Sequence, residues 1–153
     1  MSVTSAGILL FKRTVALTQV FLIHPGGPFY AHKDAGVWSI PKGEFIEEND
    51  EEAARREFYE ETGKQWPGAL TALGTVKMSG GKIIFAFAAE GEFDTTTFHS
   101  QTFDLEWPPK SGHMKSFPEA DRCAWFDLSI ARQKIHPAQI PFLDRLTEFL
   151  TNS

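Results

Sequence analysis

Residues 40–64 read Ile-Pro-Lys-Gly-Glu-Phe-Ile-Glu-Glu-Asn-Asp-Glu-Glu-Ala-Ala-Arg-Arg-Glu-Phe-Tyr-Glu-Glu-Thr-Gly-Lys and are the most informative part of the chain. A glycine-bearing loop leads into a predicted helix that carries Glu57, Glu60 and Glu61. Side chains at i, i+3 and i+4 lie on one helix face. At ~4 Å and an effective dielectric near 20, two desolvated carboxylates repel by roughly 4 kcal/mol. A divalent cation removes this repulsion, and hard cations prefer carboxylate oxygens, so the pattern predicts a metal site.

The ends of this helix carry their own signals. Asn49 or Asp50 is a suitable N-cap, acidic residues occupy the first turn, and Gly63 stands where a glycine commonly ends a helix. The predicted apolar side of the helix consists of Ala53, Ala54 and Phe58.

Hydrophobic patterning predicts strands on both sides of the helix. The predicted strands cover residues 3–11, 19–23, 36–40, 69–78, 82–90, 103–107 and 122–126. Ser79-Gly80-Gly81 is a hairpin signal, and the strand at 103–107 lies inside a long connection, 91–121. A short helix capped by Asp127 and an amphipathic helix from Pro137 complete the chain. This order predicts an α/β (α+β) fold with a mixed sheet covered by helices, in a strand order that local patterns leave open.

Length and composition are those of one globular domain, which we expect to span residues 1–153. The net charge is −5, but residues 44–61 hold nine acids and two arginines, so the rest of the chain sums to +2. Local acidity of this kind suits an anionic substrate that meets divalent cations. Extended nucleic acid is not an expected partner, because its binding usually requires a basic stripe.

The sequence also bears on location. No apolar run approaches the roughly 18 residues that span a bilayer, and the first ten residues lack signal-peptide features. The single cysteine, Cys123, cannot form an internal disulfide. We therefore expect a cytoplasmic protein that does not enter a membrane, of undetermined oligomeric state.

The central segment reads Gly43-x4-Glu48-x7-Arg56-Glu57-Phe58-x-Glu60-Glu61-x-Gly63-Lys64. It resembles the Nudix box, G-x5-E-x7-R-E-U-x-E-E-x-G-U, where U is a bulky apolar residue. Flanking segments resemble a bacterial subgroup of predicted NTP pyrophosphohydrolases. The resemblance implies a Nudix-like α/β/α sandwich with a central mixed β-sheet. Two departures stand out: the first gap is one residue shorter than the pattern, and Lys64 replaces an apolar residue.

The same resemblance implies a chemistry. Similar proteins cut a pyrophosphate bond in a nucleoside diphosphate derivative, using Mg²⁺ or Mn²⁺ and a metal-activated water. The metal ligands it implies are Glu57, Glu60 and Glu61, with the Gly43 carbonyl and Glu48 as further candidates. Arg56 would hold a ligand glutamate in place. The general base stays open between Glu57, Glu60 and Glu119 of the long connection, with Asp121 a weaker candidate.

Four residues are candidates for contact with the substrate. Lys42, Lys77 and Lys82 could bind phosphate oxygens, and Trp38 could stack on a base. Each also has a plain structural interpretation, since exposed lysines are ordinarily solvated and a tryptophan in a strand ordinarily packs in the core.

Several substrates and functions fit these residues. A small nucleotide substrate could be an NTP, a dinucleoside polyphosphate or a nucleotide sugar. A 5′-end RNA pyrophosphohydrolase and a non-catalytic nucleotide sensor are the alternatives. The lack of a basic stripe disfavours the first alternative, and the complete set of box glutamates disfavours the second.

Overall fold

The computed structural model describes residues 3–152. Its main sheet has six strands, β1 (Thr4–Arg13), β2 (Thr18–Pro25), β3 (Lys42–Glu44), β4 (Thr71–Lys77), β5 (Ile83–Glu90) and β8 (Ala120–Asp127). The strand order is β4-β5-β1-β2-β8, and β3 also pairs with β1. Strands β1 and β5 run parallel, whereas the other pairs are antiparallel. The predicted mixed sheet is therefore confirmed.

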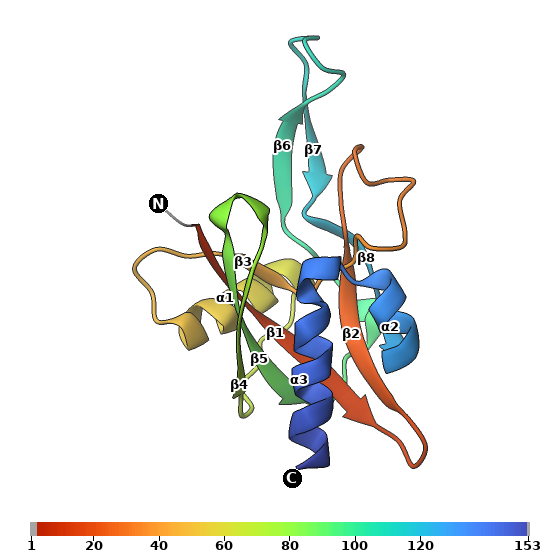
Figure 1. Cartoon of the computed structure of the whole chain (residues 1–153). Coiled ribbons are helices and arrows are strands. Elements are labelled where there is room, and N and C mark those ends of the chain that lie inside the picture. Colours follow the sequence, from red (N-terminus) through yellow and green to blue (C-terminus); the bar gives the residue numbers. More distant parts are fainter. Residues whose placement is uncertain (1–2, 153) are drawn as a thin grey trace.

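Helices cover both faces of this sheet (Figure 1). Helix α1 (Asp50–Thr62) packs on one face, and α2 (Leu128–Lys134) and α3 (Ile140–Thr151) pack on the other. Strand β1 is buried on both sides, because Ile8 and Leu10 belong to the core beside α1 while Leu9 and Phe11 belong to the opposite core. The α/β/α arrangement agrees with the predicted fold class. None of the helices within residues 3–152 is long and apolar enough to cross a membrane.

Helix α1 has the predicted ends. The Asn49 side chain accepts hydrogen bonds from the backbone N–H groups of Glu51 and Glu52, so Asn49 is the N-cap. At the other end Gly63 adopts φ 84°, and its N–H donates to the Tyr59 carbonyl. The predicted apolar residues Ala53, Ala54 and Phe58 are fully buried. This burial orients the helix, so the faces beside its apolar side carry the acidic residues.

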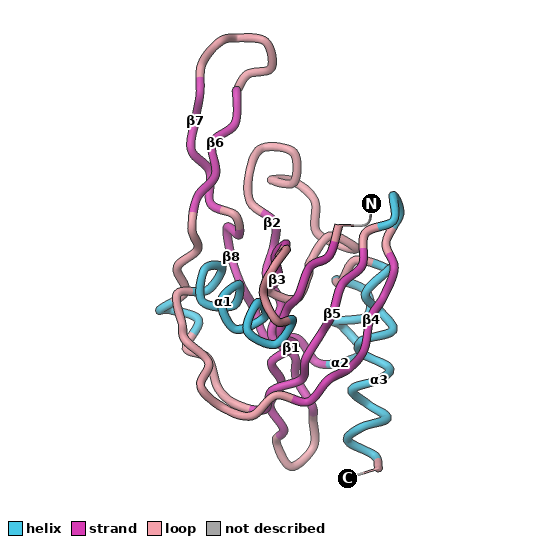
Figure 2. Tube along the Cα trace, turned by 90° about the vertical axis from the view of Figure 1, so that its left-hand side faces the viewer, coloured by secondary structure: helices cyan, strands magenta, loops and turns pink. Residues whose placement is uncertain are grey.

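The long connection forms an arm that the sequence predicts only in part. Strand β6 (Thr102–Glu106) matches the predicted strand, but it pairs with β7 (Met114–Pro118), which the sequence does not predict. Residues 114–118 are mostly exposed and include a lysine, a serine and a proline, so they lack a strand pattern. The two strands form a separate sheet that projects from the body of the molecule (Figures 1 and 2). We call residues 102–118 the arm.

Two further predictions are corrected. The predicted strand at 36–40 makes only isolated bridges, Trp38 with Ile135 and Ser39 with Ile23. The true strand in this region is β3, which lies after Pro41 and was not predicted. The terminal α-helix begins at Ile140 rather than at Pro137, because Pro137–Gln139 form a 3-10 turn first.

Candidate functional site

Three separate parts of the chain form one acidic pocket of about 420 Å³. Strand β3 contributes residues 42–44, helix α1 contributes three glutamates, and the residues that flank the arm contribute Gln101 and Glu119. The lining residues are Lys42, Gly43, Glu44, Glu57, Glu60, Glu61, Gln101 and Glu119. Five of the eight are glutamates, so the pocket concentrates negative charge around one lysine.

Backbone pairing brings these parts together. In the register of β1 and β3, Gly7 lies opposite Lys42. A β-carbon at Gly7 would lie 2.4 Å from the Pro41 carbonyl oxygen, so a glycine is required where the loop crosses β1. On the arm side, the Gln101 N–H donates to the Glu60 carbonyl at 2.9 Å, and the Glu119 N–H donates to the Gln101 carbonyl at 2.8 Å. The arm is thus hydrogen-bonded to the acidic end of α1.

Glu57 is the most enclosed of the predicted metal ligands. Its residue is only 9% exposed, and its carboxylate accepts a hydrogen bond of 2.9 Å from Arg56. Burial, followed by the hydrogen bond and charge of Glu60, raises the pKa of Glu57 to about 7, although Arg56 acts in the opposite direction. A nearby cation would stabilise the ionised form of a carboxylate in this environment.

Glu61 and Glu119 extend the acidic cluster. Burial raises the pKa of Glu61 to about 8; Lys42 lowers it, and the charges of Glu57 and Glu119 raise it. The pKa of Glu119 is also raised, first by burial and then by the charge of Glu60. Glu119 directly follows the arm and lines the pocket beside the helix acids, and its role as a base stays a prediction.

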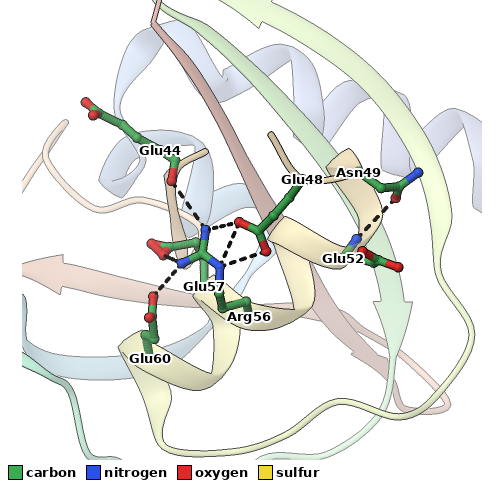
Figure 3. A network of polar contacts seen from close by, with 7 residues as sticks. All are labelled: Glu44, Glu48, Asn49, Glu52, Arg56, Glu57 and Glu60. Carbon is green, nitrogen blue, oxygen red and sulfur yellow. Dashed lines mark hydrogen bonds and ion pairs between the residues drawn. The ribbon is translucent and has the colours of Figure 1, made fainter. Parts of the chain in front are cut away.

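Arg56 donates hydrogen bonds to the carboxylates of Glu48, Glu57 and Glu60 (Figure 3). Its Nε and Nη2 donate to Glu48, with distances of 2.6 to 2.9 Å, and its Nη1 donates to Glu57 at 2.9 Å and Glu60 at 2.8 Å. These partners raise the pKa of Arg56, the Glu48 hydrogen bond most strongly. Both Glu48 oxygens face Arg56, and Glu48 does not line the pocket. Glu48 therefore faces Arg56 rather than the pocket, and the expected roles of Glu48 and Arg56 stay predictions.

The donor set fits a hard divalent cation, since it consists of carboxylate oxygens. Within residues 3–152, no three His, Cys, Asp or Glu side chains already stand in a metal-binding arrangement. Arg56 explains part of this, because its guanidinium binds oxygens of Glu57 and Glu60. Arg56 contacts only Oε2 of each carboxylate, so Glu57 and Glu60 can each keep this hydrogen bond and offer the other oxygen to a cation.

The predicted substrate contacts divide into two groups. Lys42 lines the acidic pocket and an adjoining smaller one of about 190 Å³, which Ile23, Pro25, Ser39 and Ile40 also line. Lys77 and Lys82 flank the β4–β5 turn and line neither pocket.

Trp38 is a core residue and not a base-stacking surface. It is 5% exposed, its ring packs edge-on against Phe126 and His24, and its indole N–H donates to Asp34. The structure therefore corrects the prediction that Trp38 contacts the substrate, because neither of its faces is open to a ligand.

Sequence reasoning missed two pocket residues, Glu44 and Gln101. Gln101 belongs to no motif, and only its position just before a predicted strand could have drawn attention to it. Asp121, the weaker base candidate, does not line the pocket and instead accepts a hydrogen bond from the buried His24 ring at 2.8 Å.

Comparison with known proteins identifies the family. A family model described as "NUDIX domain" matches residues 1–146. No curated protein matches the sequence. The chain therefore belongs to the NUDIX domain family. The predictions of this family and of a Nudix hydrolase are confirmed, whereas the bacterial subgroup stays a prediction.

Solved structures show the same fold at low sequence identity. The NUDIX domain of Shewanella oneidensis NrtR, crystallised with ADP ribose, aligns with a TM-score of 0.68 and 17% identity, over 98% of this chain and 89% of that one. A Caenorhabditis elegans Ap4A hydrolase binary complex aligns with a TM-score of 0.66 and 19% identity, over 99% of both chains. A mutT/nudix family protein from Listeria innocua has a TM-score of 0.64 and 17% identity, over 98% and 94%.

Proposed function

We propose that this protein hydrolyses a pyrophosphate bond in a small nucleoside diphosphate derivative, with Mg²⁺ or Mn²⁺ held by Glu57, Glu60 and Glu61. The observation that carries this proposal is the gathering of five glutamates and Lys42 around one pocket, in which burial and like charge raise the pKa of Glu57, Glu61 and Glu119. Such a cluster is unfavourable alone and favourable around a cation that also binds phosphate oxygens. The Gly43 carbonyl is a candidate additional ligand.

When bound, the cation neutralises charge on phosphate oxygens and makes a coordinated water more acidic. The protein's own residues then have separate tasks. Arg56 orients Glu57 and Glu60 through the hydrogen bonds described above. Lys42, the cation among the lining residues, offers its ammonium group to a phosphate oxygen of the substrate.

Glu119 is the preferred general base. A base must have an oxygen free to accept a proton from water. Arg56 occupies oxygens of Glu57 and Glu60, whereas the Glu119 carboxylate has no hydrogen-bond or ion-pair partner among residues 3–152. Its backbone is nevertheless held at both sides, because Glu119 N–H donates to Gln101 and the Glu119 carbonyl accepts from Gly26. Its side chain can therefore act from a fixed position.

The sequence supports further proposals about the domain, its location and its partners. We place this activity in a single domain of residues 1–153 that works in the cytoplasm on a small nucleotide, without extended nucleic acid as a partner. The absence of a basic stripe supports the last point.

A panel of nucleotides with Mg²⁺ tests the proposal. NTPs, dinucleoside polyphosphates, nucleotide sugars and a short 5′-triphosphorylated RNA are assayed for phosphate, pyrophosphate and nucleotide products. Reaction in ¹⁸O-labelled water then shows which phosphorus receives the oxygen. Cleavage of a small nucleotide with ¹⁸O in one phosphate product supports the proposal, and cleavage of the RNA alone supports the alternative enzyme.

A matched pair of variants connects turnover with the pocket. Glu60→Gln removes a proposed metal ligand, and we expect turnover to fall at least about a hundredfold, the scale of losing an essential charge-stabilising group. Glu52→Gln changes an exposed acid of the same helix outside the pocket and should leave turnover unchanged. Binding of every nucleotide without turnover, with or without metal, would instead identify a sensor.

A further inference from the structure

The arm and the neighbouring loop 26–36 form one unit above the acidic pocket. Figures 1 and 2 show them side by side, both projecting from the same end of the sheet. The rings of Phe29 in the loop and Trp107 in the arm meet edge-to-face, with centroids 5.5 Å apart. Nearer the base, a β-carbon at Gly27 would lie 3.1 Å from the Phe103 ring. The loop therefore contacts the arm at two levels, near Phe103 and near Trp107.

This unit presents unusual apolar surface. Phe29 is 59% exposed, Tyr30 is 41% exposed, and Met114 at the far end of the arm is 65% exposed. Isolated exposed hydrophobic residues are common, but these residues gather on one projection. Because an edge-to-face contact covers only part of a ring, Phe29 keeps surface on which a flat ligand can stack.

The base of the projection lies at the pocket. Gln101 and Glu119, the residues that flank the arm at its base, line the pocket and are hydrogen-bonded to each other. In the strand register, Phe103 lies opposite Phe117, and Leu105 lies opposite Lys115. Directly opposed residues point to the same face of a hairpin, so Lys115 lies on the face that holds Phe103. A ligand that extends from the pocket along this face meets a lysine before it reaches Phe29 and Trp107.

The distance from the pocket to the aromatic pair indicates which kind of nucleotide could span both. Trp107 lies six positions beyond Gln101, which corresponds to about 20 Å of strand at roughly 3.3 Å per residue. A nucleotide whose phosphates lie in the pocket reaches this distance only when a second group follows the phosphate chain. Exposed aromatic rings suit a nucleobase, and a lysine between them and the pocket suits phosphate.

We propose that Phe29 and Trp107 form a distal subsite for the second nucleobase of a dinucleoside polyphosphate, whose phosphate chain lies between the acidic pocket and this subsite. This inference rests on the proposed function and narrows its substrate class. The first nucleotide binds at the pocket, Lys115 faces the phosphate chain, and the second base stacks on the Phe29 ring.

A shortened arm tests the subsite. Asp104 and Ser116 lie opposite each other in the register, so an Asn-Gly turn can join them in place of Leu105–Lys115. Gln101, Glu119 and their hydrogen bond remain. We expect the KM for diadenosine tetraphosphate to rise about tenfold or more, the scale of losing a base-stacking ring, while kcat/KM for ATP stays within about twofold. An equal effect on both nucleotides, or none on either, would overturn the inference.

Point variants and a binding measurement make the test independent of the loop design. Phe29→Ala and Trp107→Ala should reproduce the selective rise in KM, whereas Tyr59→Ala, which removes a 47% exposed ring on α1, should not. In the wild-type protein, a methylene analogue of diadenosine tetraphosphate should shift the Trp107 indole NMR signal, assigned with Trp107→Phe, and ATP should leave it in place. An unmoved signal at saturating analogue contradicts the subsite. If the wild-type protein neither binds nor cleaves any nucleotide, the proposed function fails and this inference fails with it.

Discussion

The carboxylate of Glu57 packs directly against the α-carbon of Gly43. A β-carbon built on Gly43 would lie 1.5 Å from Glu57 Oε1 and 2.1 Å from its carboxyl carbon, closer than any non-bonded contact allows. Gly43 belongs to β3 and Glu57 to α1, so the missing side chain lets the strand and the helix bring their pocket residues together. Glycine is required here by close approach.

Replacing this glycine should therefore damage the site while sparing the fold. We expect Gly43→Ala to displace the Glu57 carboxylate by about 1 Å and to lower kcat/KM by up to about a hundredfold, as small misplacements at reacting centres do. Far-UV circular dichroism should stay unchanged. In a double-mutant cycle the same change on a Glu57→Ala background should have little further effect, because its target is already gone. Fully additive losses would contradict this explanation.

Arg56 should not be replaceable by lysine. Its planar guanidinium binds Glu48 through two nitrogens and also reaches Glu57 and Glu60, which a single ammonium group cannot do. We expect Arg56→Lys to raise the Mg²⁺ concentration for half-maximal activity about tenfold or more, as changes in groups that orient ligands do. Arg55→Lys is the control, since Arg55 binds the carbonyls of Trp66 and Gly68. Equal metal titrations of the two variants would refute this role.

Stability without metal should fall as the pH rises. The pKa of Glu57 is raised from 4.5 to about 7 and that of Glu61 from 4.5 to about 8, chiefly by burial. Above pH 4.5 the unfolded chain releases these protons while the folded chain keeps them, so raising the pH favours unfolding until about pH 8. In EDTA, Tm should decline between pH 5 and pH 8.

The same experiment contains its own controls. Glu61→Gln should flatten the decline, because the amide has no proton to lose in this range. Saturating Mg²⁺ should raise Tm most above pH 7, where the carboxylates are ionised and bind the cation. A Tm that rises between pH 5 and pH 8 in EDTA would show that these glutamates are not held in a desolvated cluster.

Gln139 should contribute to stability through the loop that precedes β3. This residue is 1% exposed, its Oε1 accepts from the Ile40 N–H, and its Nε2 donates to Ser39. We expect Gln139→Leu to lower the free energy of unfolding by about 1–3 kcal/mol, the cost of leaving buried polar groups unpaired. Urea denaturation measures the loss. Gln133→Leu, at an exposed position of α2, should change stability far less, and equal losses would rule out the buried hydrogen bonds as the cause.

The predictable parts of the structure are those set by neighbouring residues. Asn49 and Gly63 mark the ends of α1 through hydrogen bonds within one helical turn, and the burial of Phe58 follows from its place on the apolar side. Gln101, by contrast, carries no local signal, and β7 has too little apolar character to be recognised without its partner β6. Trp38 is an aromatic residue of a kind that often stacks on ligands, but it packs against Phe126 and is buried.

The acidic cluster on α1 could be read from the chain because a helical repeat of 3.6 residues places Glu57, Glu60 and Glu61 together wherever that helix lies. The predicted metal site follows from this local geometry, whereas the family follows from the resemblance to the Nudix box and the match to the family model. The complete pocket could not be read in this way, because Glu119 lies 58 residues beyond Glu61 and reaches it through hydrogen bonds at the base of an arm. Contacts across such separations depend on how the whole sheet is paired, and no periodicity in the sequence encodes them.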